Sequence, residues 1–328
     1  MKTPFSVLLL ASVLCFGPAL AIITQNNWSY AGVGDTDQEF WKDIDGSFCD
    51  GSSQSPINIV TKWTREIERA PFNLQSYDTT IDATVENNGH ALEIEVSKMP
   101  GEGHYDVTGG GLSGTFRAVQ FHFHFGSNSM QGSEHTIDGE RYPAEMHIVH
   151  YDTAYSSVSE AVKNKGGIAV LGFFLEVDDD DNSALDIILD QASNLVRPHT
   201  HQEMAGFTLS NLLPSSLDKF WRYDGSLTTP LCNEVVTWTL FEDTIKISNN
   251  QLNIMRTLMS DAIDEAGYEM PMENNFRDIQ SRGIRTIYAV TADDDYGMSP
   301  TPTASAGKSA PGAMIVLDAF LVAMALRF

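Results

Sequence analysis

The amino-acid sequence predicts one large domain built around a β-sheet, of the mainly-β or α/β class with few helices. Apolar and polar residues alternate with a period of two in many short segments, a pattern typical of strands with one buried face. Only two segments show helical periodicity, and glycine clusters separate the strand-like runs. No internal repeat is evident, so residues 25–290 are expected to form a single domain.

The predicted elements follow one another through this domain. Strands are expected at residues 84–86, 91–96, 116–125, 146–151, 168–177 and 235–241, where β-branched and aromatic residues alternate or run together. Helices are expected at residues 184–195 and 250–265, where apolar residues recur every three or four positions. The glycines at 109–111 and 166–167 mark turns.

The two ends of the chain differ from the domain between them. Residues 1–21 are expected to be a signal peptide, with a positive start, an apolar stretch and a small-residue cleavage site. Residues 291–312 have the Asp, Ser, Thr and Pro content of a linker, and residues 313–328 form an apolar tail. Small residues before this tail resemble a GPI attachment signal. A short structural segment of a secreted form and a membrane span are the alternatives.

These ends predict an extracellular protein, either secreted or attached to the outer leaflet by a GPI lipid anchor. Cys15 lies in the leader, which leaves Cys49 and Cys232 as an even pair where a disulfide is permitted. Two separate thiols are the alternative. Asn27 begins the only Asn-x-Ser/Thr motif and is the candidate glycan acceptor.

The formal net charge is −24, with 44 acidic residues against 20 lysines and arginines. Phosphate recognition needs clustered basic residues, so this balance argues against nucleic acid and anionic membrane surfaces as partners. The acidic runs at 178–181 and 293–295 are interpreted as solvated loops, with weak Ca²⁺ binding as the alternative.

Histidine alternates with phenylalanine at 120–125, in the sequence QFHFHF. On a strand, His122 and His124 point to one face and the phenylalanines to the other. Two such histidines have Cα atoms roughly 6.5–7 Å apart, a spacing that a zinc ion can bridge. His147 lies in a second β-rich segment and is expected to join them from a neighbouring strand. Three imidazoles without a fourth protein ligand are typical of catalytic zinc. Buried sheet histidines are the alternative.

Eight segments in order give the sequence a specific likeness to a known family. They are QSPINI (54–59), NNGHA (87–91), QFHFHFG (120–126), GSEHT (132–136), AEMHIVH (144–150), AVLG (169–172), GSLTTP (225–230) and NFR (275–277). Together they resemble the α-class carbonic anhydrases over residues 25–290. The resemblance implies a single domain around a large, twisted, mostly antiparallel central sheet with few short helices. Secreted members of the family have a disulfide at positions like Cys49 and Cys232.

The resemblance also implies the activity, which is zinc-dependent, reversible hydration of CO₂ to bicarbonate and a proton. In this family a zinc-bound hydroxide attacks CO₂. A non-catalytic, carbonic anhydrase-related binding module is the alternative, since the same fold serves for binding when its metal site is lost. The three histidines, Thr228, Glu134 and His90 are all present, which favours the enzyme.

The family's catalytic roles are carried over by motif. Thr228 and Glu134 match the pair that orients the hydroxide, because a threonine hydroxyl can donate to a carboxylate and accept from the hydroxide. Thr229 matches a contact for bicarbonate. Four residues match the apolar wall of the substrate pocket: Val149, Leu227, Val236 and Trp238. Phe125 and Leu231 depart from the family's usual residues.

His90 matches the position of the family's proton shuttle, and histidine titrates near neutral pH. Tyr30 and Asn88 resemble polar residues that hold a water chain. Glu93 departs from the neutral residue common there. It is expected either to raise the pKa of His90 or to disturb the water chain.

Metal-bound imidazoles usually donate their second N–H group to an acceptor. Gln120 precedes His122 by two residues and shares its strand face, and Glu145 stands in the same relation to His147. The backbone carbonyl of Asn275 resembles the acceptor for His124. His135, Tyr223 and His150 are interpreted as structural.

Overall fold

A computed structural model describes residues 28–30, 37–96 and 103–293. The predicted signal peptide, the glycan acceptor Asn27, the apolar tail and all but the first residues of the predicted linker lie outside the described residues. No helix in the described part of the chain has the length and apolar character needed to cross a membrane.

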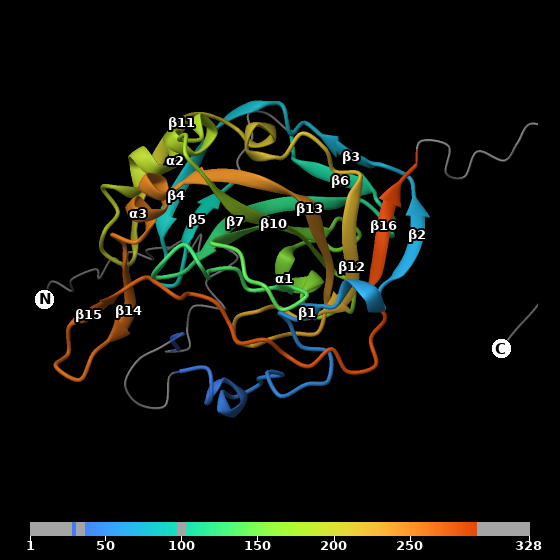
Figure 1. Cartoon of the computed structure of the whole chain (residues 1–328), viewed down its shortest axis with the longest axis horizontal. Coiled ribbons are helices and arrows are strands. Elements are labelled where there is room, and N and C mark those ends of the chain that lie inside the picture. The colour runs from blue at the N-terminus through green and yellow to red at the C-terminus, as the bar shows by residue number, and fades with distance from the viewer. Residues whose placement is uncertain (1–27, 31–36, 97–102, 294–328) are drawn as a thin grey trace, which may run out of the picture. The chain divides into compact units, whose positions relative to one another are not determined.

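The described residues contain a central sheet of twelve strands, in which residues far apart in the chain lie side by side (Figure 1). Ten follow one path: β11 (Thr200–Thr208), β4 (Thr80–Asn87), β5 (Leu92–Glu95), β7 (Phe116–Phe125), β9 (Ala144–Asp152), β10 (Ile168–Asp178), β13 (Val236–Ser248), β12 (Lys219–Gly225), β16 (Tyr288–Ala292) and β2 (Arg65–Arg69). Off this path, β6 (Asp106–Gly109) pairs with β7 and with β3 (Phe72–Gln75).

The pairing confirms the predicted fold class. Only β10 with β13 and β16 with β2 are parallel, and the other pairs of this sheet are antiparallel. Two small sheets join β1 (Asn58–Ile59) to β8 (Thr136–Ile137) and β14 (Met259–Ile263) to β15 (Glu269–Pro271). The helices are short: α1 (Val158–Ala161), α2 (Ser183–Ala192), α3 (Asn249–Met255) and the 3₁₀ turns η1 (Trp41–Asp43), η2 (Thr61–Trp63) and η3 (Leu209–Leu212).

Each of the six predicted strands lies wholly or largely in an observed one, because alternating residues fit a half-buried pleated surface. The strand predicted at 116–125 coincides with β7, whereas the strand predicted at 235–241 continues as β13 to Ser248. Strand β16 extends to Ala292, two residues into the segment predicted as a linker.

The predicted helix at 250–265 is wrong in its second half. Helix α3 begins with a capping box between Ser248 and Gln251 and ends at Met255, and the chain then enters strand β14. The backbone there bonds to distant segments instead of to the preceding turn: Met259 donates to the carbonyl of Val196 (2.7 Å) and Asp261 to that of Gly89 (3.0 Å). Tertiary partners therefore override the local helical pattern.

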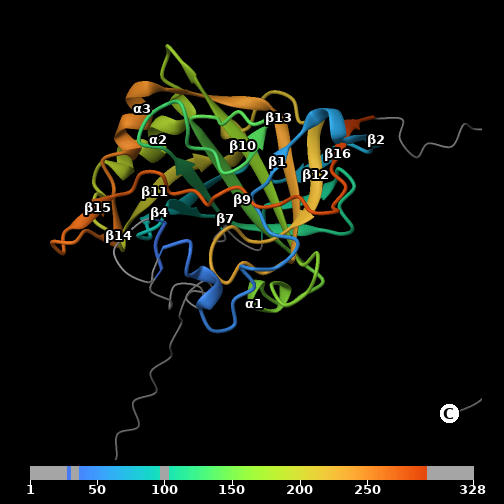
Figure 2. The same ribbon diagram turned by 60° about the horizontal axis from the view of Figure 1, so that its bottom comes forward.

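The two faces of the sheet carry different side chains. On β7, the phenylalanines at 121, 123 and 125 are fully buried in the larger apolar core, together with the inner faces of α2 and α3. The histidines of β7 lie on the opposite face, where a second apolar cluster is built around Trp238 and Tyr223. Figure 2 shows the same strands from a second direction, with β7, β9 and β10 adjacent. The alternation of β7 thus turns its histidines away from the main core.

A disulfide joins Cys49 to Cys232 across 183 residues of chain. Both cysteines are buried beside Trp28 and Trp41 in a small apolar cluster. In the chain-entropy view, closing so long a loop stabilises the fold by about 5 kcal/mol, because it restricts the unfolded chain. The link also ties the segment after η1 to the loop that follows Thr228.

His150 is buried and makes structural hydrogen bonds. Its Nδ1–H donates to the carbonyl of Ile148 (3.0 Å), so its Nε2 accepts from the hydroxyl of Tyr77, which is also buried. Burial lowers the pKa of His150 to about 4, which keeps the ring neutral near neutral pH. The position of His150 among these partners agrees with the structural interpretation.

We expect Tyr77→Phe to lower the free energy of unfolding by about 1–3 kcal/mol, because a buried acceptor on His150 would lose its donor. Denaturant-induced unfolding measures the change. Tyr268→Phe is the matched control, since Tyr268 is 72% exposed. Equal midpoints for the two variants would contradict a stabilising role for this bond.

Candidate metal centre and active site

Strands β7 and β9 bring three histidines together. In their antiparallel register His122 lies opposite His147, and His124 lies opposite Glu145. One ring nitrogen of each histidine lies within 4.8 Å of the corresponding nitrogen of the other two. His124 and His147 are buried, and His122 is half-buried. The histidines that the sequence singled out therefore form one cluster of possible metal ligands.

Hydrogen-bond acceptors set the tautomer of each ring. His122 Nδ1–H donates to Gln120 Oε1 (2.9 Å), and His124 Nδ1–H donates to the carbonyl of Asn275 (2.7 Å). His147 donates through its other nitrogen, Nε2–H, to Glu145 Oε1 (2.6 Å). In a neutral ring the remaining nitrogen then carries a lone pair. Three lone pairs therefore converge, from His122 Nε2, His124 Nε2 and His147 Nδ1.

Burial keeps the rings of His122 and His124 available as ligands. It lowers the pKa of His124, and it lowers the pKa of His122 well below its ordinary value, with His124 and His147 adding to the effect on His122. For Glu145, burial opposes ionisation, but the neighbouring His135 and His147 hold the pKa of its carboxyl well below its usual range. The acceptor behind His147 is therefore a carboxylate.

The cluster fits a cation. His124 Nε2 and His147 Nδ1 are 3.1 Å apart, and with the tautomers above no proton lies between them. Two facing lone pairs at this distance repel each other unless a cation lies nearby. Glu134 Oε2 is buried without a hydrogen-bond partner among the described residues, 3.5 Å from His124 Nε2 and 4.0 Å from His147 Nδ1. Histidine nitrogens in this number suit Zn²⁺.

A second group of possible ligands consists of His135, Glu145 and His147. Its atoms are engaged with one another, since His135 Nδ1–H donates to Glu145 Oε1 (2.7 Å) and His135 Nε2 accepts from the hydroxyl of Tyr223 (2.6 Å). Ser55 Oγ lies 2.8 Å from the same hydroxyl. His135 and Tyr223 thus belong to a buried hydrogen-bond chain that supports Glu145.

The expected bond between Thr228 and Glu134 is absent from the hydrogen bonds of the described residues. Glu134 Oε1 accepts from the backbone N–H of Arg277 (2.8 Å), and Oε2 is the oxygen without a partner. Thr228 is buried, with 6% of its surface exposed. The carboxylate therefore retains one free acceptor that faces the histidine cluster.

Apolar residues flank the cluster on one side. Val236 and Trp238 are buried in the second apolar cluster, and Val149 and Leu227 pack against it. The ring of Trp238 lies 4.8 Å from that of His147. The indole N–H of Trp238 donates to the carbonyl of Ser226 (3.0 Å), which ties this wall to the loop that carries Thr228 and Thr229.

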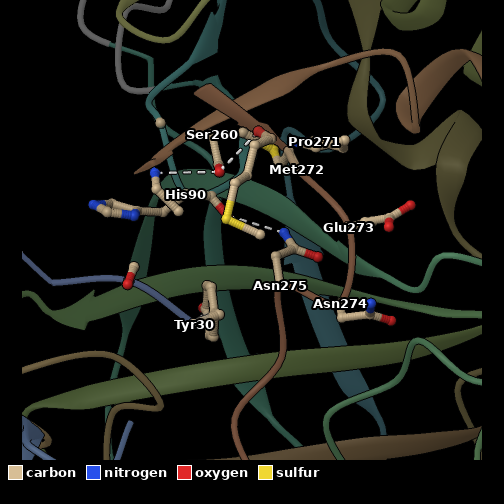
Figure 3. A pocket seen from close by; sticks show the side chains of 12 residues that line it. Tyr30, His90, Ser260, Pro271, Met272, Glu273, Asn274 and Asn275 are labelled. Carbon is tan, nitrogen blue, oxygen red and sulfur yellow. Dashed lines mark hydrogen bonds between the residues drawn. The ribbon is translucent and has the colours of Figure 1, made fainter. Parts of the chain in front are cut away.

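His90 lies apart from the three histidines. Its ring stacks on Trp28, with centroids 3.8 Å apart. His90 also lines a cavity of about 110 Å³, and its imidazole points away from the other labelled side chains in Figure 3. Tyr30, Ser260 and Asn275 line the same cavity. Burial, and then His199, lower the pKa of His90 to about 4. The ring is therefore largely neutral at neutral pH.

Asn88 and Glu93, expected to act near His90, make hydrogen bonds at the turn that carries it. Asn88 Oδ1 accepts from the backbone N–H groups of His90 (2.9 Å) and Ala91 (2.8 Å), and its amide donates to Glu93 Oε2 (3.2 Å). Burial, and then Glu86, raises the pKa of Glu93 to about 7. The pKa of His90 is shifted downward, so the expectation that Glu93 raises it is not met. The alternative, that Glu93 disturbs a water chain, stays a prediction.

The residues that sequence reasoning missed near His90 are Trp28, His199 and Asp261. Asp261 Oδ2 lies 3.8 Å from His90 Nε2, and His199 Nε2 lies 3.0 Å from Asp261 Oδ1. Asp261 stands in the segment predicted as a helix, so its contact with residues 89 and 90 had no signal in the sequence. The strand β14 places it there.

Comparison with known proteins agrees with this arrangement. The family model for eukaryotic-type carbonic anhydrase matches residues 36–291. Three curated relatives illustrate the likeness. A putative carbonic anhydrase 3 of Caenorhabditis elegans is 34% identical (81% of this chain, 99% of the relative), carbonic anhydrase 1 of Mus musculus is 36% identical (80% and 98%), and carbonic anhydrase 4 of Rattus norvegicus is 35% identical (78% and 81%).

The fold, the histidine cluster and these matches define a zinc-dependent class of lyase, and the chain belongs to the eukaryotic-type carbonic anhydrase family. It is a carbonic anhydrase, the family whose reaction is CO₂ hydration. The resemblance drawn from the sequence is thereby confirmed, and the non-catalytic alternative is set aside.

Proposed function

We propose that this carbonic anhydrase hydrates CO₂ reversibly to bicarbonate and a proton with one zinc ion held by His122, His124 and His147. The observation that carries the proposal is the convergence of three unprotonated ring nitrogens beside the unpaired Oε2 of Glu134. When bound, zinc lowers the pKa of a water molecule so that hydroxide is available near neutral pH. Gln120, Glu145 and the carbonyl of Asn275 hold the ligand rings in their tautomers.

Thr228 and Glu134 orient the nucleophile in this proposal. Glu134 Oε1 is engaged by Arg277, so Oε2 is the acceptor left for the hydroxyl of Thr228. Once Thr228 donates to the carboxylate, its oxygen can only accept. The hydroxide would then donate a hydrogen bond to the Thr228 oxygen, which leaves one of its lone pairs directed toward CO₂. Thr229 supplies a further polar contact for bicarbonate.

The apolar wall binds CO₂. CO₂ has no net dipole and offers weak acceptors, so apolar side chains hold it without competing for the nucleophile. We assign this wall to Val149, Leu227, Val236 and Trp238, because these residues share one apolar cluster in which Trp238 packs against His147. Phe125, which departs from the family's usual residue, is buried in the core on the other face of β7 and lies away from this wall.

A proton must leave the site in each hydration cycle. We assign its transfer to His90, which lines a cavity that is roomy enough for several water molecules. Tyr30 lines the same cavity, and Asn88 fixes the turn that carries His90. Because burial disfavours the protonated ring, a proton taken up by His90 has to be passed on quickly.

We further propose that the enzyme acts outside the cell. A disulfide between Cys49 and Cys232 supports this location, because such bonds persist in oxidising compartments. In this view residues 1–21 are removed as a signal peptide, Asn27 carries a glycan, and the residues from 293 to 312 link the domain to a GPI signal at 313–328. The net charge of −24 leaves no expectation of nucleic acid as a partner.

The zinc assignment is tested by His124→Ala. The purified wild-type enzyme should carry about one zinc per chain, and the variant should lose zinc and CO₂ hydration together, because only two ligands remain. Elemental analysis and stopped-flow hydration, with and without a chelator, measure both. His201→Ala, an exposed histidine on β11, is the control and should keep both. Full zinc content in His124→Ala would overturn the ligand set.

Two further variants separate the attack on CO₂ from the transfer of the proton to solvent. His90→Ala should lower kcat by up to about a hundredfold, the low end for a positioned proton-transfer group, while kcat/KM for CO₂ stays nearly unchanged. Added imidazole should restore much of kcat. Thr228→Ala should lower both parameters, because it disorders the nucleophile. If imidazole gave no rescue of His90→Ala, the shuttle role would have to be abandoned.

The lipid anchor is tested in cells that express the full chain. A phosphatidylinositol-specific phospholipase should release surface carbonic anhydrase activity into the medium, since a GPI anchor is cut between lipid and protein. A chain that ends at residue 312 is the control and should be secreted without the phospholipase. Activity that stays on the cells after treatment would indicate a membrane span, and activity already in the medium would indicate a secreted form.

A further inference from the structure

We propose that Asp261 and His199 form an outer relay that carries protons between His90 and the solvent. The proposal rests on the shuttle role assigned above to His90, and it adds two residues that act through it. His90, Asp261 and His199 come from three separate segments of the chain, and Asp261 lies between the two imidazoles. We call these three residues the exit cluster.

The geometry of the exit cluster leads outward. His90 Nε2 lies 3.8 Å from Asp261 Oδ2, and Asp261 Oδ1 lies 3.0 Å from His199 Nε2, so the two histidines approach different oxygens of one carboxylate. The exposed fractions of the side chains rise along the series, from 14% for His90 to 28% for Asp261 and 65% for His199. The buried shuttle is thereby connected to a ring in contact with solvent.

The fold holds Asp261 beside His90 through the backbone. The N–H of Asp261 donates to the carbonyl of Gly89 (3.0 Å), and the N–H of Met259 donates to the carbonyl of Val196, three residues before His199. Gly89 has a φ of +91°, and a Cβ atom there would lie 2.4 Å from the carboxylate of Asp261. Glycine at this position is therefore what allows the close approach.

A metal site is a poor account of the exit cluster. A metal ion bonded at roughly 2.0–2.1 Å to histidine nitrogen needs its ligand atoms within about 4 Å of one another. Within the described part of the chain, the groups whose ligand atoms lie mutually within 4.8 Å are the two described above, and the exit cluster is not among them. Its linear arrangement, with the carboxylate in the middle, suits proton transfer instead.

The charges around the exit cluster support transfer between His90 and Asp261. Burial, and then His199, lowers the pKa of His90 to about 4, whereas burial raises the pKa of Asp261 against the opposing effect of His199. Glu269, on the facing strand β15, adds to the rise for Asp261. The proton affinities of the imidazole and the carboxylate thus move toward each other, and a proton can pass between them without a large change in free energy.

The relay works in three balanced steps. Protonated His90 gives its Nε2 proton to Asp261 Oδ2, which leaves a neutral imidazole and a neutral carboxylic acid. A half-turn about the Cβ–Cγ bond of Asp261 presents that proton to His199 Nε2, and the carboxylate is restored when His199 takes it. His199, now an imidazolium, releases a proton to buffer or water. Rotation of the two side chains closes the 3.8 Å gap, which is longer than a hydrogen bond.

The test uses the zinc-loaded enzyme in dilute buffer. Asp261→Asn should lower kcat by about tenfold or less, below the usual range for a proton-transfer group because water offers a bypass, and kcat/KM should stay unchanged. Imidazole should restore kcat. His199→Ala should act in the same direction, more weakly. The matched controls are Asp264→Asn, on the turn after β14, and His201→Ala, two residues from His199; both should leave kcat unchanged.

A double variant separates the relay from a merely structural ion pair. Because Asp261 acts through His90, Asp261→Asn should lower kcat no further in the His90→Ala background. The relay would be overturned if the losses of kcat in the double variant were additive. It would also be overturned if Asp261→Asn lowered kcat/KM as much as kcat, or left kcat unchanged; Asp261 would then form an ion pair only. If Asp261→Asn lowered kcat and His199→Ala did not, the proposed role of His199 would be overturned.

A readout independent of activity keeps the two proposals distinguishable. The ¹⁵N signals of the His90 and His199 rings should both shift in Asp261→Asn, and neither should shift in Asp264→Asn. Unmoved ring signals would overturn the exit cluster itself even if the enzyme is active. Absence of zinc-dependent CO₂ hydration in the wild-type protein would instead overturn the proposed function and take the relay with it.

Discussion

The antiparallel pairing of β7 with β9 is the constraint on which the site depends. Side chains alternate across a strand, so β7 buries its phenylalanines in the main core and presents His122 and His124 on the other face. The register with β9 then places His147 opposite His122. A slip of one residue would move all of these side chains to the wrong face. The same apolar burial that stabilises the sheet therefore fixes the geometry of the histidine cluster.

The groups behind the histidines explain why the cluster suits a cation. Each ring donates one N–H group to an oxygen atom. The acceptors belong to Gln120, Asn275 and Glu145, and all three residues are buried. Glu145 receives hydrogen bonds from two histidines and remains ionised although it is buried. A negative charge of this kind has to be compensated, and its hydrogen-bonded histidines do so in part. The histidine rings are thus held in place by the groups behind them.

The proposed proton path depends on different parts of the fold. The three clustered histidines stand on the long central strands β7 and β9, whereas His90 lies between β4 and β5, and Asp261 lies on β14. Figure 1 labels these strands. Strand β14 is attached through backbone hydrogen bonds to Gly89 and Val196. Burial of His90 disfavours its protonated form, so a neighbouring acceptor has more influence here than beside an exposed shuttle. The chemistry and the proton exit can therefore vary independently in such a fold.

The sequence by itself determined the strand class, the histidine alternation and the family, because these depend on local periodicity and on side-chain types at fixed spacing. It also indicated Gln120 and Glu145 as partners of the histidines, since parity along a strand assigns faces. Only the tertiary structure decided that residues 259–263 form a strand instead of a helix, because their backbone partners lie at Val196 and Gly89. It alone decided the surroundings of His90, where Trp28, His199 and Asp261 meet from segments far apart in the chain. Contacts between distant segments leave no periodic pattern in the sequence. The desolvation that they cause sets the pKa of His90, so this pKa could not be inferred from the neighbours of His90 along the chain.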